Sequence, residues 1–337
     1  MKISPPISGG LILSYKCSAA CRHCMYACSP KWKGDWISET DLKNCLSQLS
    51  ETIQPSPWGK RTISLNHGLH FTGGEPFLNF DLLLKAVRLA ADIGIPSTFV
   101  ETNCYWCTTD DVTRKHLTHL RDTGLTGILI SVNPFYSEWI PFERTERCIK
   151  ISEEIFGQNL IVYQLEFYRL FKSLGVKSKL SLDDYLDLTA NMHFTAKVEL
   201  FLMGRATRRL RKYYAAYPAV RFYGEPCRPQ FLRSWHNHFD NYGNFIAGYC
   251  GGISLGHWRN LPDLIKEGID LNAHPILACI IAGDIQQLLN LAEDFGYQES
   301  PQGYLSKCDL CQDIRKFLVN IQDFEELRPK EYYRHLE

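Results

Sequence analysis

The chain has 337 residues, 45% of them apolar, which is enough for a buried core in one large domain with room for a smaller second one. Its 37 basic and 37 acidic residues give a formal net charge of zero, so nucleic acid is not an expected partner. The densest basic cluster is short and is explained by a solvated helix face: Arg208, Arg209, Arg211 and Lys212. No signal peptide or apolar run of membrane-spanning length is evident, so the 13 Cys indicate metal ligation in a reducing, cytoplasmic setting rather than disulfides.

Strand-like and helix-like segments alternate over the first two thirds of the chain. Short apolar runs predict strands at residues 10–15, 69–72, 98–102, 127–132, 160–163 and 197–203. Helical periodicity predicts helices at residues 81–93, 111–122, 145–156, 165–174 and 182–192, with Gly94 and Gly124 as stop signals. This alternation predicts an α/β fold with parallel strands, in which functional residues gather at the carboxyl ends of the strands.

The pattern changes after Tyr217 and Pro218, where a segment rich in Gly, Cys and aromatic residues begins. Residues 235–239 and 245–247 flank a turn with Asn and Gly, which predicts a β-hairpin. Helices are expected around residues 261–266, 275–279, 284–295 and 313–327. We therefore predict a core domain over residues 1–215 and a small α+β domain over residues 216–337.

The most informative motif is C-x3-C-x2-C, formed by Cys17, Cys21 and Cys24 after the first predicted strand. Three thiolates at this spacing can hold three irons of a [4Fe–4S] cube and leave the fourth iron open to a ligand, whereas clusters that only transfer electrons usually have four Cys ligands. A zinc site or buried apolar thiols are the alternatives, and Arg22 and His23 between the last two Cys make a purely apolar role unattractive.

Together with Gly73-Gly74-Glu75-Pro76 after the second predicted strand, this motif resembles the radical S-adenosylmethionine (radical SAM) enzymes. The resemblance implies a partial (β/α)6 barrel of TIM type, which the six predicted strands fit. It also implies that the open iron chelates SAM and that reductive cleavage of SAM gives a 5′-deoxyadenosyl radical. Residues implied in SAM binding are Gly73, Gly74, Glu75 and Pro76, with His23 at a usually aromatic position and Asn103, Ser131 and Asn133 at strand ends. Ordinary turn roles are the alternative for the last three.

A second Cys group lies in the predicted C-terminal domain and consists of Cys227, Cys250, Cys308 and Cys311. One Cys precedes the predicted hairpin, one follows it, and the last two form a C-x2-C. This layout resembles the SPASM/Twitch extensions of radical SAM enzymes, in which a second, auxiliary [4Fe–4S] cluster is bound. Because no Cys follows Cys311, the single-cluster Twitch form is the closer match. A tetrahedral zinc site would use the same four ligands and remains the alternative.

Three further Cys lie in loops near the predicted barrel mouth: Cys28, Cys104 and Cys107. A thiol there could act catalytically by donating a hydrogen atom to a substrate radical, and a small packed residue is the alternative. Cys104 and Cys107 could also form a redox or metal-binding pair. This interpretation is weaker, because the sequence shows no second Cys pair to complete such a site. Cys45, Cys148 and Cys279 fall on predicted helices and are expected in the core.

The sequence thus predicts a radical SAM enzyme that oxidises, crosslinks or epimerises a peptide side chain. Oxidation or dehydrogenation of a small molecule is the alternative, since only 16 residues precede the Cys motif and no peptide-recognition domain is expected there. A non-catalytic Fe–S protein is a third interpretation, which the open iron disfavours. A reductant such as flavodoxin or ferredoxin is the expected protein partner, and no membrane partner is expected.

Overall fold

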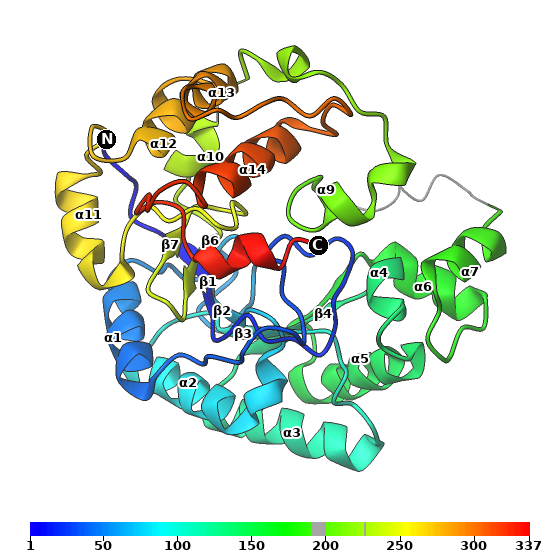
Figure 1. Cartoon of the computed structure of the whole chain (residues 1–337). Helices are drawn as coiled ribbons and strands as arrows, with labels where there is room; N and C mark the ends of the chain where they lie inside the picture. Colours follow the sequence, from blue (N-terminus) through cyan, green and yellow to red (C-terminus); the bar gives the residue numbers. More distant parts are fainter. Residues whose placement is uncertain (191–199, 226) are drawn as a thin grey trace. The chain divides into compact units, whose positions relative to one another are not determined.

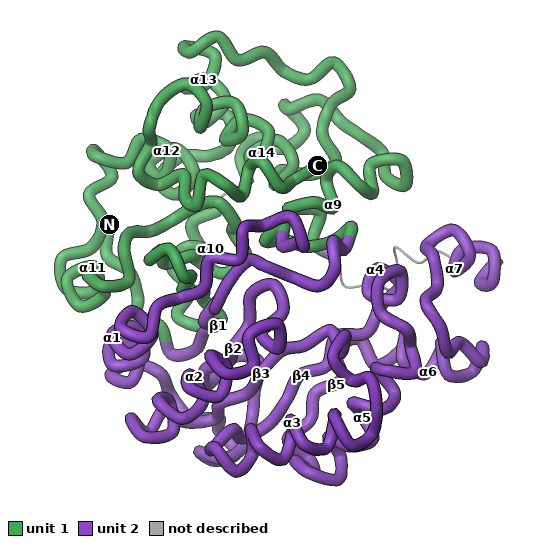
Figure 2. The backbone as a smooth tube through the Cα atoms, turned by 60° about the horizontal axis from the view of Figure 1, so that its bottom comes forward, with its two compact units in different colours: residues 1–6, 22–27, 201–337 green, residues 7–21, 28–200 purple. Residues whose placement is uncertain are grey.

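The computed structural model describes residues 1–190, 200–225 and 227–337, which form two compact units (Figure 2). The barrel unit comprises Ile7–Cys21 and Cys28–Leu200. The C-terminal unit comprises Met1–Pro6, Arg22–Ala27 and Phe201–Glu337. Residue 215, near which we predicted a domain boundary, lies inside the last of these segments, and the boundary stays a prediction. None of the helices in the described residues has the length and apolarity that crossing a lipid bilayer requires.

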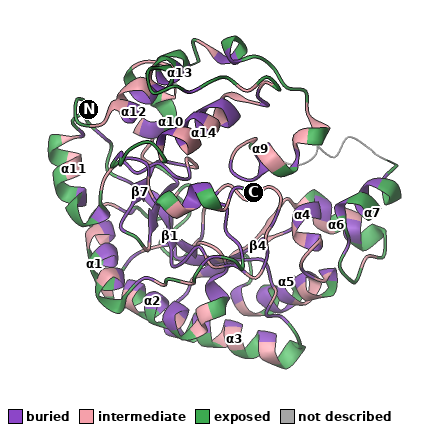
Figure 3. Cartoon of the chain, viewed as in Figure 1, coloured by how far each residue is buried: buried purple, intermediate pink, exposed green. Residues whose placement is uncertain are grey.

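The barrel unit contains five parallel strands that neighbour one another in chain order (Figure 1). They are β1 (Ser8–Ile12), β2 (Gly68–Thr72), β3 (Phe99–Thr102), β4 (Gly127–Ser131) and β5 (Leu160–Tyr163). Every residue of β1 and β2 is buried, as expected for parallel strands covered by helices (Figure 3). Strictly sequential order is the order of a β/α barrel, so the predicted α/β class and barrel-type arrangement are confirmed.

Helices connect these strands and follow one another around the outside of the sheet (Figure 1). The main ones are α1 (Glu39–Ser50), α2 (Phe80–Ile93), α3 (Asp110–Thr123) and α5 (Phe142–Phe156), with shorter helices η1 (Pro76–Asn79), α4 (Pro134–Ser137), α6 (Leu165–Ser173) and α7 (Leu182–Leu188). Gly94 and Gly124 end α2 and α3 in the left-handed conformation that glycine adopts readily, with φ of 87° and 118°. Both predicted stop signals are therefore confirmed.

Two predictions at the end of the barrel unit differ from the structure. Helix α7 ends at Leu188, four residues before its predicted end, and residues 191 and 192 lie outside the described part. Residues 197–199 of the predicted strand over residues 197–203 are not described, and the other four, 200–203, are irregular. The sixth strand is thus not among the strands of the described residues.

The C-terminal unit combines a small hairpin with short helices. Strands β6 (Asn237–Asp240) and β7 (Phe245–Ile246) pair antiparallel through His238–Ile246 and Phe239–Phe245, so the predicted hairpin is confirmed. The remaining elements are α9 (Ala206–Arg209), η2 (Arg211–Tyr213), η3 (Ala219–Phe222), α10 (Arg228–Leu232), η4 (Trp258–Asn260), α11 (Leu261–Glu267), α12 (Pro275–Leu277), η5 (Ala278–Ala282), α13 (Ile285–Asp294), α14 (Lys307–Leu318) and η6 (Lys330–Arg334).

The predicted last helix, residues 313–327, is displaced: α14 begins at Lys307 and ends at Leu318. Its start is fixed by Ser306, whose hydroxyl accepts a hydrogen bond from the Asp309 N–H at 3.0 Å. The sequence signal was therefore present as Ser at the N-cap with an acidic residue three positions later. The shift matters because it places both Cys308 and Cys311 on one helix, one turn apart.

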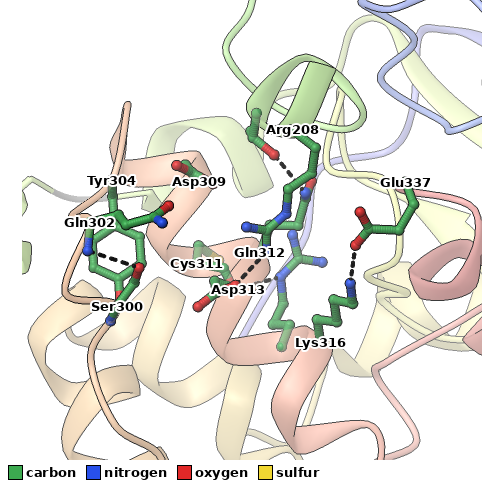
Figure 4. Close-up of polar contacts among 12 residues, drawn as sticks. Arg208, Ser300, Gln302, Tyr304, Asp309, Cys311, Gln312, Asp313, Lys316 and Glu337 are labelled. Carbon is green, nitrogen blue, oxygen red and sulfur yellow. Dashed lines mark hydrogen bonds and ion pairs between the residues drawn. The ribbon is translucent and has the colours of Figure 1, made fainter. Parts of the chain in front are cut away.

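The predicted solvated face is confirmed for Arg209 and Lys212, which are exposed, but not for Arg208 and Arg211, which are half-buried and form ion pairs. Arg208 is paired with Asp313 on α14 (Figure 4). Arg211 is paired with Asp309 at 3.2 Å. At the other end of α14, Lys316 contacts Glu337 at 2.5 Å (Figure 4). The pairs of Arg208 and Arg211 are partly buried, whereas the Glu337 side chain is 68% exposed, so the first two pairs are the ones expected to help hold α14 in place.

Candidate active site

The loop with the C-x3-C-x2-C motif follows β1 and is divided between the two units. The Cys17 N–H donates to the Ser29 carbonyl at 3.2 Å, which closes the base of the loop within the barrel unit. Cys17 and Cys21 are buried members of that unit. Cys24 belongs to the C-terminal unit, where its carbonyl accepts a hydrogen bond from the Arg205 N–H at 3.0 Å.

The Gly73–Pro76 loop follows β2 and packs directly on the backbone that leads into Cys17. The Gly74 N–H donates to the Ser14 carbonyl at 2.8 Å, and the Glu75 N–H donates to the Lys16 carbonyl at 3.0 Å. A Cβ on Gly74 would lie 1.9 Å from the Lys16 carbonyl oxygen. The absence of a Cβ at Gly74 therefore permits a close approach to the protein backbone, in addition to the SAM-binding role that the resemblance implies.

The Glu75 side chain joins this loop to the end of β3. One carboxylate oxygen accepts hydrogen bonds from the Thr102 hydroxyl at 2.9 Å and the Phe77 N–H at 3.3 Å, and the other accepts from the Asn103 N–H at 2.9 Å. Burial raises the pKa of Glu75 to about 7, against the opposing effect of these hydrogen bonds. From the sequence, Glu75 had only the SAM-binding role that the resemblance implies, and this link was missed.

Asn103 completes a set of contacts at the ends of three adjacent strands. Its side-chain amide lies 3.7 Å from the Cys17 sulfur and 3.1 Å from the Ser18 hydroxyl. Because its main-chain N–H binds Glu75, one residue contacts both the Gly73–Pro76 loop and the first Cys of the motif. The structure thus brings together Cys17, Glu75 and Asn103, three residues that the sequence singled out separately.

Other predicted SAM contacts lie in ordinary structural settings. Asn133 caps α4 by accepting from the Phe135 N–H at 3.0 Å, and its amide donates to Gln164 at 3.0 Å. Ser131 is the half-buried last residue of β4. Burial, together with the positive charge of Arg205, lowers the pKa of His23 to about 3, so this ring is neutral at physiological pH. The roles of these residues toward SAM stay predictions.

The four Cys of the C-terminal group line one cavity of about 40 Å³ within the C-terminal unit. One water molecule needs only about 10–15 Å³, so the cavity has room for a larger group. Cys308 and Cys311 come from α14, Cys227 from the start of α10, and Cys250 from the loop after β7. Burial raises the pKa of the Cys250 thiol to about 12, although the Arg315 guanidinium acts in the opposite direction.

Arg315 is a buried cation beside this cavity that sequence reasoning missed. It lies one turn after Cys311 on α14, and its guanidinium donates to the Cys311 carbonyl at 3.3 Å, the Gly251 carbonyl at 3.0 Å and the Tyr333 hydroxyl at 2.9 Å. Four thiolates would place negative charge in a buried site, and a fixed guanidinium next to them offsets part of that cost. The donor set and the cavity therefore fit a thiolate-bound metal group.

The three loop thiols lie in the barrel unit and are buried. The Cys28 sulfur is 3.5 Å from the Gly73 carbonyl oxygen. Cys104 and Cys107 lie after β3, where they meet Cys148 from α5, a contact that the sequence did not predict. Their proposed hydrogen-donor role stays a prediction.

Comparisons with known proteins give only distant likenesses. No family profile and no curated protein matches the chain. Among similar solved structures are BtrN in complex with AdoMet and 2-DOIA, with 13% identity, a TM-score of 0.47 and coverage of 85% of this chain and 91% of that chain. Another similar structure is native anSMEcpe with bound AdoMet, which has 13% identity and a TM-score of 0.45. The match covers 94% of this chain and 99% of that chain. Likeness at this level does not decide a function, which has to be argued from the residues of this chain.

The buried Glu75 gives a test of this geometry through stability. In Glu75→Gln, an amide NH2 replaces one accepting oxygen, so one buried donor loses its acceptor at a cost of about 1–3 kcal/mol. The wild type should lose stability as the pH rises from 4.5 to 7, because the raised pKa means that the unfolded chain ionises Glu75 first. The difference between variant and wild type in urea unfolding should therefore be largest at pH 5 and shrink by pH 8.

A matched control is Glu39→Gln on α1, whose side chain is 66% exposed. Its stability difference from the wild type should be small at both pH values. A difference for Glu75→Gln that is equally large at pH 5 and pH 8 would contradict the raised pKa of Glu75.

Proposed function

We propose that this chain is a radical SAM enzyme that modifies a peptide side chain by oxidation, crosslinking or epimerisation. The observation that carries the proposal is the packing of the Gly73–Pro76 loop on the backbone before Cys17, with Asn103 in contact with both. Three polar features at the ends of β1, β2 and β3 thereby meet at the carboxyl edge of the sheet, where β/α barrels carry their active sites.

In this proposal Cys17, Cys21 and Cys24 would hold a [4Fe–4S] cluster, and the SAM-binding residues would be His23, Gly73, Gly74, Glu75, Pro76, Asn103, Ser131 and Asn133. When bound, the cluster and SAM would supply a 5′-deoxyadenosyl radical that removes a substrate hydrogen atom. The chain would hold the cluster next to Asn103 in a buried loop, which excludes water from the reacting groups. His23 would contribute a planar ring at the position that is usually aromatic in this family.

The proposal also assigns an auxiliary [4Fe–4S] cluster to Cys227, Cys250, Cys308 and Cys311. The cavity that these thiols line favours a cluster over a single zinc ion, because four sulfurs close around zinc at about 2.3 Å and leave no such space. A peptide substrate follows from the resemblance to SPASM/Twitch enzymes. Oxidation of a small molecule is the second candidate, and a reductant such as flavodoxin or ferredoxin is the proposed partner.

The decisive experiment is reduction of the anaerobically reconstituted chain in the presence of SAM, with detection of 5′-deoxyadenosine by mass spectrometry. We expect turnover by the wild type and by Cys45→Ala, which alters a buried thiol on α1 outside the site. Asn103→Ala should reduce SAM cleavage roughly tenfold or more, because it removes the amide beside Cys17. A fully reconstituted chain that yields no 5′-deoxyadenosine is not a radical SAM enzyme.

The mass of the product distinguishes hydrogen-atom donation by a thiol from net oxidation of the substrate. If Cys28, Cys104 or Cys107 donates a hydrogen atom, the product keeps the mass of the substrate, and turnover in D2O places deuterium on carbon because thiols exchange with solvent. If the reaction is an oxidation, the product is two hydrogens short of the substrate, which is the result that we expect. Deuterium incorporation that is lost in one of the three Cys variants would overturn this expectation.

A further inference from the structure

A third group of cysteines lies within the barrel unit. The sulfurs of Cys104, Cys107 and Cys148 are all within 4.8 Å of one another, and all three residues are fully buried. Neither proposed cluster uses them. Cys148 comes from α5, more than forty residues after the C-x2-C of Cys104 and Cys107, so the fold and not local sequence brings the third thiol to the other two.

The loop that carries the first two thiols is shaped before any ligand binds. The Cys107 N–H donates to the Cys104 carbonyl at 3.1 Å, which forms a tight turn across the C-x2-C. Cys104 has a φ of 68°, a left-handed conformation that residues with a Cβ seldom adopt. Its N–H is held by the Thr102 hydroxyl at 3.1 Å. Turns across a C-x2-C are a common way to direct two thiolates toward one metal ion.

Helix α5 holds this loop at two points on the same helix that supplies Cys148. The Arg147 guanidinium donates to the Cys107 carbonyl at 2.7 Å and also pairs with Asp110 at 2.8 Å. One turn earlier, Arg144 donates to the Tyr105 carbonyl. These contacts fix the loop on α5, so the three sulfurs converge without the help of a bound ion.

From this arrangement we propose that Cys104, Cys107 and Cys148 bind one thiophilic metal ion, Zn²⁺, as a site separate from both Fe–S clusters. Sulfurs bound to a common zinc lie about 3.8 Å apart, given Zn–S bonds of about 2.3 Å, so small side-chain rotations suffice. Three thiolates with Zn²⁺ leave one net negative charge in the buried site, whereas Cu⁺ would leave two, and a smaller buried charge costs less. The Ser152 hydroxyl, 4.0 Å from the Cys148 sulfur, is the neighbouring oxygen for the fourth position.

Binding transfers the three thiol protons to solvent and involves no oxidation. It also removes Cys104 and Cys107 from the candidate hydrogen donors, which leaves Cys28. The proposed zinc site does not depend on SAM chemistry, so its test can succeed or fail whatever the outcome for the proposed function.

The test uses the anaerobically purified full chain with its iron and sulfide reconstituted, equilibrated with Zn²⁺ and then dialysed against a weak chelator. Elemental analysis should find about one zinc per chain in the wild type and in the Cys45→Ala control, and almost none in Cys148→Ala or Cys107→Ala. The iron content should be the same in all four proteins. X-ray absorption at the zinc edge should show three sulfur neighbours.

Several results would overturn this proposal. Zinc that persists in Cys148→Ala and Cys107→Ala but is lost in Cys308→Ala, with four sulfur neighbours, would belong to the C-terminal group. A wild-type chain without zinc would show the three thiols to be packed core residues. A chain that takes up no Zn²⁺ but binds one Cu⁺ in a parallel anaerobic equilibration with Cu⁺ would retain the three-thiolate site and overturn the choice of ion. Because two variants on different elements are compared, poor folding of one leaves the test intact.

Discussion

Replacing Cys17, Cys21 and Cys24 together with Ala should lower the iron content of the reconstituted chain from about eight to about four per molecule and abolish SAM cleavage. Eight irons correspond to two [4Fe–4S] clusters, and the variant keeps only the ligands of the auxiliary one. Loss of SAM cleavage should be complete, because the variant has no ligands left for the cluster that would bind SAM. Iron and sulfide analysis with a 5′-deoxyadenosine assay measures both effects.

The matched variant is Cys308→Ala, which should remove the other four irons and leave SAM binding intact, since it alters neither the three Cys of the first motif nor the Gly73–Pro76 loop. About four irons in the unaltered chain, together with zinc lost in Cys308→Ala, would contradict the auxiliary cluster and spare the first one. Zinc lost in Cys148→Ala instead would belong to the barrel unit, so the two zinc outcomes are distinguishable.

The strands of the barrel unit could be predicted because their signals are local. β5 agrees with its predicted residues, and β2, β3 and β4 differ by one residue at one end, since short apolar runs between turn residues are the pattern of buried parallel strands. β1 was predicted less well: it begins two residues and ends three residues before the predicted bounds, 10–15. Helix α14 was displaced in the prediction because the apolar periodicity after Asp313 outweighed the capping signal at Ser306. The predicted helix therefore began after Cys308 and Cys311, whereas both lie on α14.

The contacts that organise the candidate site could not be predicted in the same way. The motif identified Cys17 and the Gly73–Pro76 loop, but the Glu75 carboxylate reaches Thr102 and Asn103, more than twenty-five residues away in sequence. The contact of Cys148 with Cys104 and Cys107 likewise depends on how α5 packs. Such contacts join side chains across elements, and a single sequence carries no periodic signal for them.

Gly74→Ala is the single substitution with the largest expected effect. Its Cβ would lie 1.9 Å from the Lys16 carbonyl oxygen and 2.8 Å from the Cys17 nitrogen, and both are backbone atoms that no side-chain rotation can move away. The loop must shift and lose its hydrogen bonds to Ser14 and Lys16, at a combined cost of about 3 kcal/mol. Because the shifted backbone leads into Cys17, iron at the first cluster should fall and SAM cleavage should drop about a hundredfold or more.

Gly94→Ala is the control, because a Cβ there meets nothing within 4 Å and the cost is only that of a left-handed residue, about 1–2 kcal/mol. Its iron content and SAM cleavage should equal those of the wild type. The informative alternative for Gly74→Ala is a full iron content with weakened SAM binding by calorimetry. That result would mean that the Cβ obstructs the ligand and spares the Cys17 loop, as the sequence first suggested. Simultaneous loss of iron and SAM binding would show that Gly74 serves the cluster through the protein backbone.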